Sequence, residues 1–219
     1  MLKIEHITTG YGKKQVLTDV SFSVEKGSIV LLSGGNGSGK STVLKTIYGL
    51  LKPWTLEGKI IFEENDITAL LVSTMIQQGI VYMPQKKNVF EDFTVEENLL
   101  TSASIYTTAD AKERIKKVYE ILPLLETLRK RTPFHLSGGE KQILAFGNML
   151  VHSPKLILLD EPFAGVDTQN SEVLKNCIQD LNKKNVTFVI VEHKRQLMEN
   201  IVSKEIELEL GTIKNVILQ

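Results

Sequence analysis

The chain has 219 residues, of which 42% are hydrophobic, enough to bury a substantial core as one domain or as a domain with a subdomain. Its 26 Lys and Arg residues balance its 26 Asp and Glu residues, so no net charge attracts nucleic acid, and we expect no nucleic-acid partner. The single cysteine excludes a disulfide framework and a cysteine metal cluster, and no apolar run reaches the about 18 residues of a membrane-spanning helix.

Hydrophobic periodicity and turn residues predict the following elements. In the first half of the chain we expect strands over residues 2–8, 16–27 and 28–33, a helix over 41–51, a hairpin over 57–67 and a strand over 79–84. In the second half we expect a helical pair over 111–131 interrupted near Pro123, a helix over 141–152, a strand over 155–160, a helix over 171–184, a strand over 186–191, a short helix over 194–200 and a hairpin over 204–218 that turns at Gly211 and Thr212. The N-terminus lacks the apolar core of a signal peptide, so we expect a protein that is not exported.

The short apolar runs LILL and FVIV indicate strands that are covered on both faces. The predicted fold class is therefore α/β, with a mostly parallel core sheet and helices on both of its faces. The N-terminal hairpins add an antiparallel β layer, and residues from about 95 to 150 form a helix-rich subdomain. We expect residues 1–219 to make a single domain.

The segment GGNGSGKST follows a predicted strand directly and precedes a predicted helix directly, and it fits the P-loop pattern G-x-x-x-x-G-K-[ST]. Backbone N–H groups wrap a phosphate only where no Cβ blocks the approach, which explains the glycines. Lys40 is placed to reach the β and γ phosphates, and the Ser41 hydroxyl is placed to ligate Mg²⁺. The residues expected to contact the nucleotide are Gly34, Gly35, Asn36, Gly37, Ser38, Gly39, Lys40, Ser41 and Thr42.

Two carboxylates, Asp160 and Glu161, end a buried strand, at the sheet edge where ligands bind in open α/β folds. Asp160 suits the Mg²⁺ shell, and Glu161 suits a general base for the water that attacks the γ-phosphate. The alternative is that one of them only caps the following turn. The P-loop upstream favours the catalytic interpretation.

The segment LSGGEKQ places Ser137, Gly138 and Gly139 at the start of a predicted helix. Glycine destabilises a helix interior by about 1 kcal/mol relative to alanine, so two adjacent glycines need a reason. Unpaired N–H groups and the positive end of the helix dipole make such a terminus a binding site for an anion.

With these three motifs in this order, the sequence resembles the ATP-binding subunits of ABC transporters over essentially its whole length, and in particular the ATPases of branched-chain or hydrophobic amino-acid importers and of lipopolysaccharide export. The resemblance implies an ATPase of the P-loop NTPase class that binds ATP and Mg²⁺ and works as a head-to-tail dimer. It also implies that Ser137 and Gly139 close on the γ-phosphate bound by a second ATPase subunit, and that residues 165–167 cross the dimer interface.

The resemblance also implies further site residues. Tyr11 would stack on adenine, Gln85 would reach Mg²⁺ and the attacking water, and His193 would contact the γ-phosphate and hold Glu161. Transmembrane permease subunits would dock near residues 85–93, which begin at Gln85 and end at Phe93. The protein would then be cytoplasmic and peripheral on the inner face of the cell membrane.

Three residues depart from the family pattern: Gly35 replaces a common proline, and Ile143 and Asn148 replace common arginines. They leave the nucleotide contacts intact, while Asn148 removes a possible buried ion pair. Two other functions stay open at this point. One is a soluble or force-transmitting ABC ATPase, for example in cofactor assembly, that moves no solute; the other is a module that binds nucleotide without hydrolysis.

Overall fold

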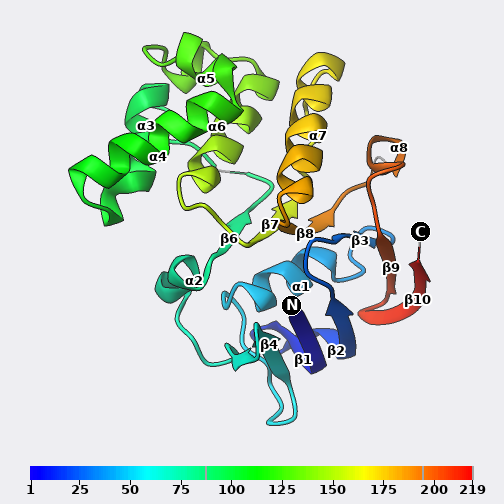
Figure 1. Ribbon diagram of the computed structural model, residues 1–219. Coiled ribbons are helices and arrows are strands. Elements are labelled where there is room, and N and C mark those ends of the chain that lie inside the picture. Colours follow the sequence, from blue (N-terminus) through cyan, green and yellow to red (C-terminus); the bar gives the residue numbers. More distant parts are fainter. Residues whose placement is uncertain (87, 194, 219) are drawn as a thin grey trace.

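A computed structural model describes residues 1–86, 88–193 and 195–218 of the chain. Figure 1 shows a helical lobe at the top, a central sheet, and a second sheet beside the N-terminus. The expected α/β class is confirmed.

The core sheet has six strands in the order β10-β9-β3-β8-β7-β6. All neighbouring strands pair in parallel except the hairpin of β9 and β10. The strands are β3 (Ile29–Ser33), β6 (Ile80–Met83), β7 (Leu156–Asp160), β8 (Thr187–Val191), β9 (Lys204–Glu209) and β10 (Thr212–Leu218).

Successive residues of each central strand pack into different cores, which explains why LILL and FVIV are apolar throughout. In β3, Ile29 and Leu31 join the core beneath the helical lobe, whereas Val30 and Leu32 join the core beneath the N-terminal sheet. Strands β7 and β8 alternate in the same way. The prediction of a sheet covered on both faces is confirmed.

The N-terminal layer is a four-stranded antiparallel sheet in the order β2-β1-β4-β5. Its strands are β1 (Leu2–Tyr11), β2 (Lys14–Val24), β4 (Lys59–Phe62) and β5 (Asn65–Asp66). Helix α1 (Lys40–Ile47) packs between this layer and the core sheet through Val43, Leu44 and Ile47. The predicted antiparallel layer is confirmed.

The helical lobe contains α3 (Val95–Ser102), α4 (Thr108–Ile121), α5 (Pro123–Thr127) and α6 (Gly138–Leu150), with short 3-10 turns at Ala103–Ile105 and Pro133–His135. The break expected near Pro123 is present, since proline begins α5 after α4 has ended. Helices α7 (Thr168–Lys183) and α8 (Arg195–Met198) precede and follow β8.

Three sequence-based expectations were incomplete or wrong. Helix α2 (Val72–Gln78) was not predicted, and its one fully buried residue, Met75, explains the weak apolar pattern. The C-terminal hairpin turns at Leu210 and Gly211, which both have positive φ, rather than at Gly211 and Thr212. The expected helix over 194–200 is shorter, and its first residue, Lys194, lies outside the described residues.

Candidate functional site

The P-loop connects β3 to α1, and Lys40 is folded back onto it. Lys40 Nζ donates to the carbonyl oxygens of Gly34 and Gly35 at 3.0 and 2.9 Å. The side chain is only 5% exposed. Burial lowers the pKa of Lys40, and the negative charges of Glu161 and Asp160 oppose that shift. The ammonium group is therefore hydrogen-bonded to two carbonyl oxygens of its own loop, and the oxygens of a bound anion can take their place.

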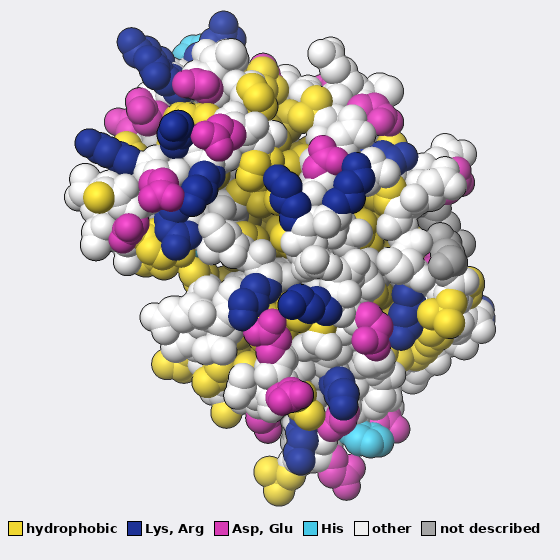
Figure 2. Space-filling model, in the orientation of Figure 1, with side chains coloured by type: hydrophobic (Ala, Val, Ile, Leu, Met, Phe, Trp, Pro, Cys, Tyr) yellow, Lys and Arg dark blue, Asp and Glu magenta, His cyan; other side chains and the backbone are white. Residues whose placement is uncertain are grey.

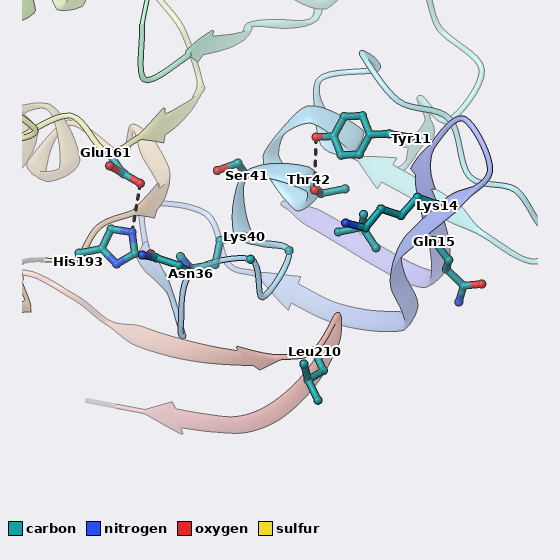
Figure 3. Close-up of a pocket in the computed structure, with 13 residues that line it drawn as sticks. Tyr11, Lys14, Gln15, Asn36, Lys40, Ser41, Thr42, Glu161, His193 and Leu210 are labelled. Carbon is teal, nitrogen blue, oxygen red and sulfur yellow. Dashed lines mark hydrogen bonds and ion pairs between the residues drawn. The ribbon is translucent and has the colours of Figure 1, made fainter.

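The loop and its surroundings fit a nucleotide. They line an open cavity of about 490 Å³ that includes Asn36, Gly37, Ser41 and Thr42 (Figure 3). Gly34 has φ of 132°, and a Cβ there would lie 2.1 Å from the Leu208 carbonyl oxygen, so only glycine fits. Within the described residues the buried Ser38 Oγ has no hydrogen-bond partner. A phosphate would supply one.

Asp160 ends β7 with both carboxylate oxygens engaged. Ser41 Oγ donates to Oδ1 at 2.8 Å, and the Tyr82 hydroxyl donates to Oδ2 at 3.1 Å. Burial raises the pKa of Asp160, while these two hydrogen bonds oppose the rise. A hydroxyl and a carboxylate in direct contact are the oxygen donors that Mg²⁺ prefers, so the residues present fit this ion.

Glu161 lies between two polar side chains from the segments that follow β6 and β8. Gln85 Nε2 donates to Oε2 at 2.5 Å. His193 Nε2 lies 3.1 Å from Oε1 (Figure 3). The backbone of Glu161 has φ of 53°, a left-handed conformation that costs a non-glycine residue on the order of 1–3 kcal/mol. Its N–H group is held by the carbonyl of Val191 at 2.8 Å. At this turn Glu161 lines the cavity.

Tyr11 lines the same cavity and is 44% exposed. Its hydroxyl lies 3.4 Å from Thr42 Oγ1, and Lys45 Nζ lies 5.5 Å from the ring centroid. An exposed aromatic ring beside a phosphate loop is able to stack on a base. The structure therefore places Tyr11 beside the P-loop, and its stacking on adenine stays a prediction.

The segment of residues 137–139 does not line this cavity. Ser137 caps α6 in a capping box, in which its Oγ accepts the N–H of Glu140 at 3.2 Å and Glu140 Oε2 accepts the N–H of Ser137 at 2.7 Å. A Cβ on Gly139 would lie 2.5 Å from the Asn170 side chain. Packing against Asn170 therefore also requires glycine at position 139, and the sequence did not reveal this contact.

A second cavity, the interlobe pocket, has a volume of about 240 Å³ and lies between the helical lobe and β6. Figure 2 shows hydrophobic side chains at the notch between the helical lobe and the rest of the molecule. Its lining includes Tyr48, Tyr82, Asn88, Phe90, Ser102 and Asn148. Within the described residues, Oδ1 of Asn88 and Oδ1 of Asn148 are buried without a hydrogen-bond partner.

Sequence reasoning missed several residues of the site. The nucleotide cavity is also lined by Lys14, Gln15, Val16 and Leu210, because β1, β2 and the final hairpin meet at the P-loop. No local motif in the sequence marks these residues. Tyr82 was missed too, although it precedes Gln85 on the same strand end. Its contact with Asp160 depends on the pairing of β6 with β7.

A sequence model of the family described as "ABC transporter" matches residues 17–164. The high-affinity branched-chain amino acid transport ATP-binding protein BraG of Pseudomonas aeruginosa is 37% identical over 213 residues, which cover 97% of this chain and 91% of BraG. The lipopolysaccharide export system ATP-binding protein LptB of Escherichia coli K12 is 33% identical, with 88% of this chain and 80% of LptB covered.

Solved structures agree with these similarities. A nucleotide-free ATP-binding cassette from an ABC transporter matches with a TM-score of 0.90 and 31% identity, over 100% of this chain and 91% of that one. A dimeric ATP-binding cassette in a post-hydrolysis state, bound to ADP and Pi, matches with a TM-score of 0.87 and 25% identity, over 100% of this chain and 98% of that one.

Proposed function

This chain belongs to the ABC transporter family as an ATP-hydrolysing subunit that works as a dimer, and from this we propose how its own residues perform the reaction. The observation that carries the proposal is the placement of Glu161 at the cavity, between Gln85 and His193. The expected resemblance is confirmed, and the alternatives of a non-hydrolysing module or an ATPase outside transport are not favoured.

The triphosphate binds in the P-loop, where Lys40 exchanges the carbonyls of Gly34 and Gly35 for phosphate oxygens. Tyr11 stacks on the adenine. The Mg²⁺ ion would be held by Ser41, Asp160 and Gln85. When bound, it would neutralise negative charge on the phosphates.

Glu161 accepts a proton from the water that attacks the γ-phosphate. Gln85 and His193 fix the position of its carboxylate, since each contacts one of its two oxygens. His193 is 41% exposed and the Glu161 side chain is 20% exposed, so both lie where a nucleotide can contact them.

The N–H groups at the start of α6 act on the nucleotide of a second ATPase subunit, identical or not. In their own chain residues 137–139 lie outside the nucleotide cavity, and only a head-to-tail partner brings Ser137, Gly138 and Gly139 to a γ-phosphate. There they stabilise negative charge in the transition state, as an arginine finger does in other NTPases.

The permease docks over residues 85–93, of which Lys87 lies outside the described residues. Phe90 and Phe93 in this segment are 54% and 42% exposed, and the interlobe pocket opens beside them. Apolar surface of this kind is typical of an interaction site. No helix in the described part of the chain is long and apolar enough to cross a membrane. We place the protein on the inner face of the cell membrane, held there by the permease.

The test combines catalysis with partner binding. Purified protein should release phosphate from ATP only with Mg²⁺, and tagged protein in its native cells should co-purify with a multi-spanning membrane protein from solubilised membranes. Phe90→Asp should lose that partner, whereas the control Leu56→Asp, on a fully exposed loop residue, should keep it. Recovery with cytosolic partners alone would contradict the permease proposal and leave the ATPase intact.

A further inference from the structure

Tyr82 lines the interlobe pocket and also contacts Asp160 at the end of β7. Its hydroxyl donates to Oδ2 of Asp160 at 3.1 Å, and its ring lines the interlobe pocket. In that pocket the ring packs on Tyr48, with 5.5 Å between the ring centroids and 41° between the planes. A single side chain therefore contacts the carboxylate proposed to hold Mg²⁺ and the surface proposed to receive the permease.

The orientation of Asp160 depends on its two donors. Ser41 Oγ holds Oδ1 at 2.8 Å and Tyr82 holds Oδ2. Asp160 is only 4% exposed, so solvent does not readily replace a lost donor. A buried carboxylate that loses its donor has to rotate or admit water. Loss of a residue that orients a metal ligand typically lowers metal affinity by about 10- to 100-fold. Ser41 is itself proposed to contact the metal, so Tyr82 is the donor left to fix Asp160 from the other side.

The ring transmits movement to the hydroxyl. A tyrosine side chain has two χ torsions and a rigid ring, so a side chain that enters the interlobe pocket and displaces the ring also displaces the hydroxyl. This route is separate from the Gln85 side chain, which contacts Glu161 and not Asp160 among the hydrogen bonds of the described residues.

We propose that Tyr82 is a positioning residue whose hydroxyl orients Asp160 for Mg²⁺, and that filling the interlobe pocket changes metal binding through its ring. The inference rests on the proposed function, namely the metal role of Asp160 and the docking of the permease over residues 85–93, beside the pocket. It adds a specific residue by which docking regulates the ATP site.

The first experiment measures Mn²⁺ binding to the ATP-bound protein by electron paramagnetic resonance. Tyr82→Phe keeps the ring and removes the hydroxyl, and it should weaken Mn²⁺ binding about 10-fold, as loss of a residue supporting a metal ligand commonly does. ATP affinity without metal should stay the same. The matched control is Tyr48→Phe, which removes a hydroxyl from the same pocket and should leave Mn²⁺ affinity unchanged.

Asp160→Asn separates failure of this inference from failure of the proposed function. If Asp160→Asn weakens Mn²⁺ binding and Tyr82→Phe does not, the role of Tyr82 is overturned and the metal role of Asp160 stands. If Asp160→Asn binds Mn²⁺ as tightly as the unchanged protein, the proposed metal role is overturned as well. Circular dichroism melts confirm that each variant is folded.

The second experiment fills the interlobe pocket without the permease. Ser102, on its lining, is replaced by cysteine in a chain that also carries Cys177→Ser, and the new thiol is labelled with a benzyl methanethiosulfonate. Labelling should change Mn²⁺ affinity by about 5-fold or more, the lower end of typical coupling between sites. The change should vanish when Tyr82→Phe is added. An equal change in both backgrounds, or none in either, would overturn the transmission through Tyr82.

Discussion

Glu161→Gln is the substitution that tests the proposed reaction most directly. Glutamine has the size of glutamate, and its amide oxygen can still accept the hydrogen bond from Gln85, so the fold and the cavity should persist. What is lost is the group that accepts the proton. General-base catalysis contributes about 10²- to 10⁴-fold, so the barrier should rise by about 3–5 kcal/mol.

The assay is phosphate release under saturating Mg²⁺ and ATP, with nucleotide affinity measured separately. Turnover of Glu161→Gln should fall by that factor while ATP affinity is kept, and the variant should accumulate as an ATP-stabilised dimer in size-exclusion chromatography. The control Glu172→Gln makes the same charge change at an exposed position of α7 and should hydrolyse ATP normally. A Glu161→Gln variant that retains half of the turnover would refute the base assignment, and one that stays monomeric with ATP and Mg²⁺ would refute the head-to-tail dimer.

Three further outcomes are expected. Ser137→Arg should abolish hydrolysis and retain nucleotide binding, since its site of action is in the partner subunit; normal turnover would exclude that role. Burial lowers the pKa of His152 to about 4, below its ordinary value of 6.5. Between these two pH values the unfolded chain binds a proton at His152 that the folded chain does not bind, so the free energy of unfolding should fall as the pH drops from about 6.5 to 4. His152→Gln should reduce this loss by about 2 kcal/mol in urea unfolding at pH 7 and pH 4.5; an unchanged pH dependence would contradict it. Gly139→Ala should lower the melting temperature by several degrees, because its Cβ would lie 2.7 Å from Cβ of Asn170 and overpacking costs about 1–3 kcal/mol, whereas Gly35→Ala has open space and should melt normally. Equal melting temperatures for these two variants would refute the packing reason.

Short-range patterns of the sequence predicted the chemistry of the site. The order of glycines before Lys40, the carboxylates at the end of an apolar strand, and the serine and glycines at the start of a predicted helix each lie within a few residues of chain. Backbone N–H donors, strand ends and helix caps obey local stereochemistry, so such spacings can be interpreted without coordinates. The apolar runs of β7 and β8 likewise predicted a sheet covered on both faces.

Other contacts depended on which strands become neighbours. Gln85 and His193 were assigned only through the family resemblance, and it is the order β8-β7-β6 that sets them on either side of Glu161. Helix α2 was not predicted because it buries little apolar surface; it packs on β6 and ends at Gly79, whose φ of 84° is left-handed.

The sequence by itself determined that this protein has a phosphate loop, an acidic strand end and a glycine-bearing helix start, since each lies within one stretch of chain. Only the tertiary structure decided that Tyr82 joins Asp160 to the interlobe pocket, that Gly139 is packed against Asn170, and that the start of α6 lies away from its own P-loop. The physical reason is that these relations join residues far apart along the chain, and their geometry is set by sheet order and by packing between lobes, which no local spacing encodes.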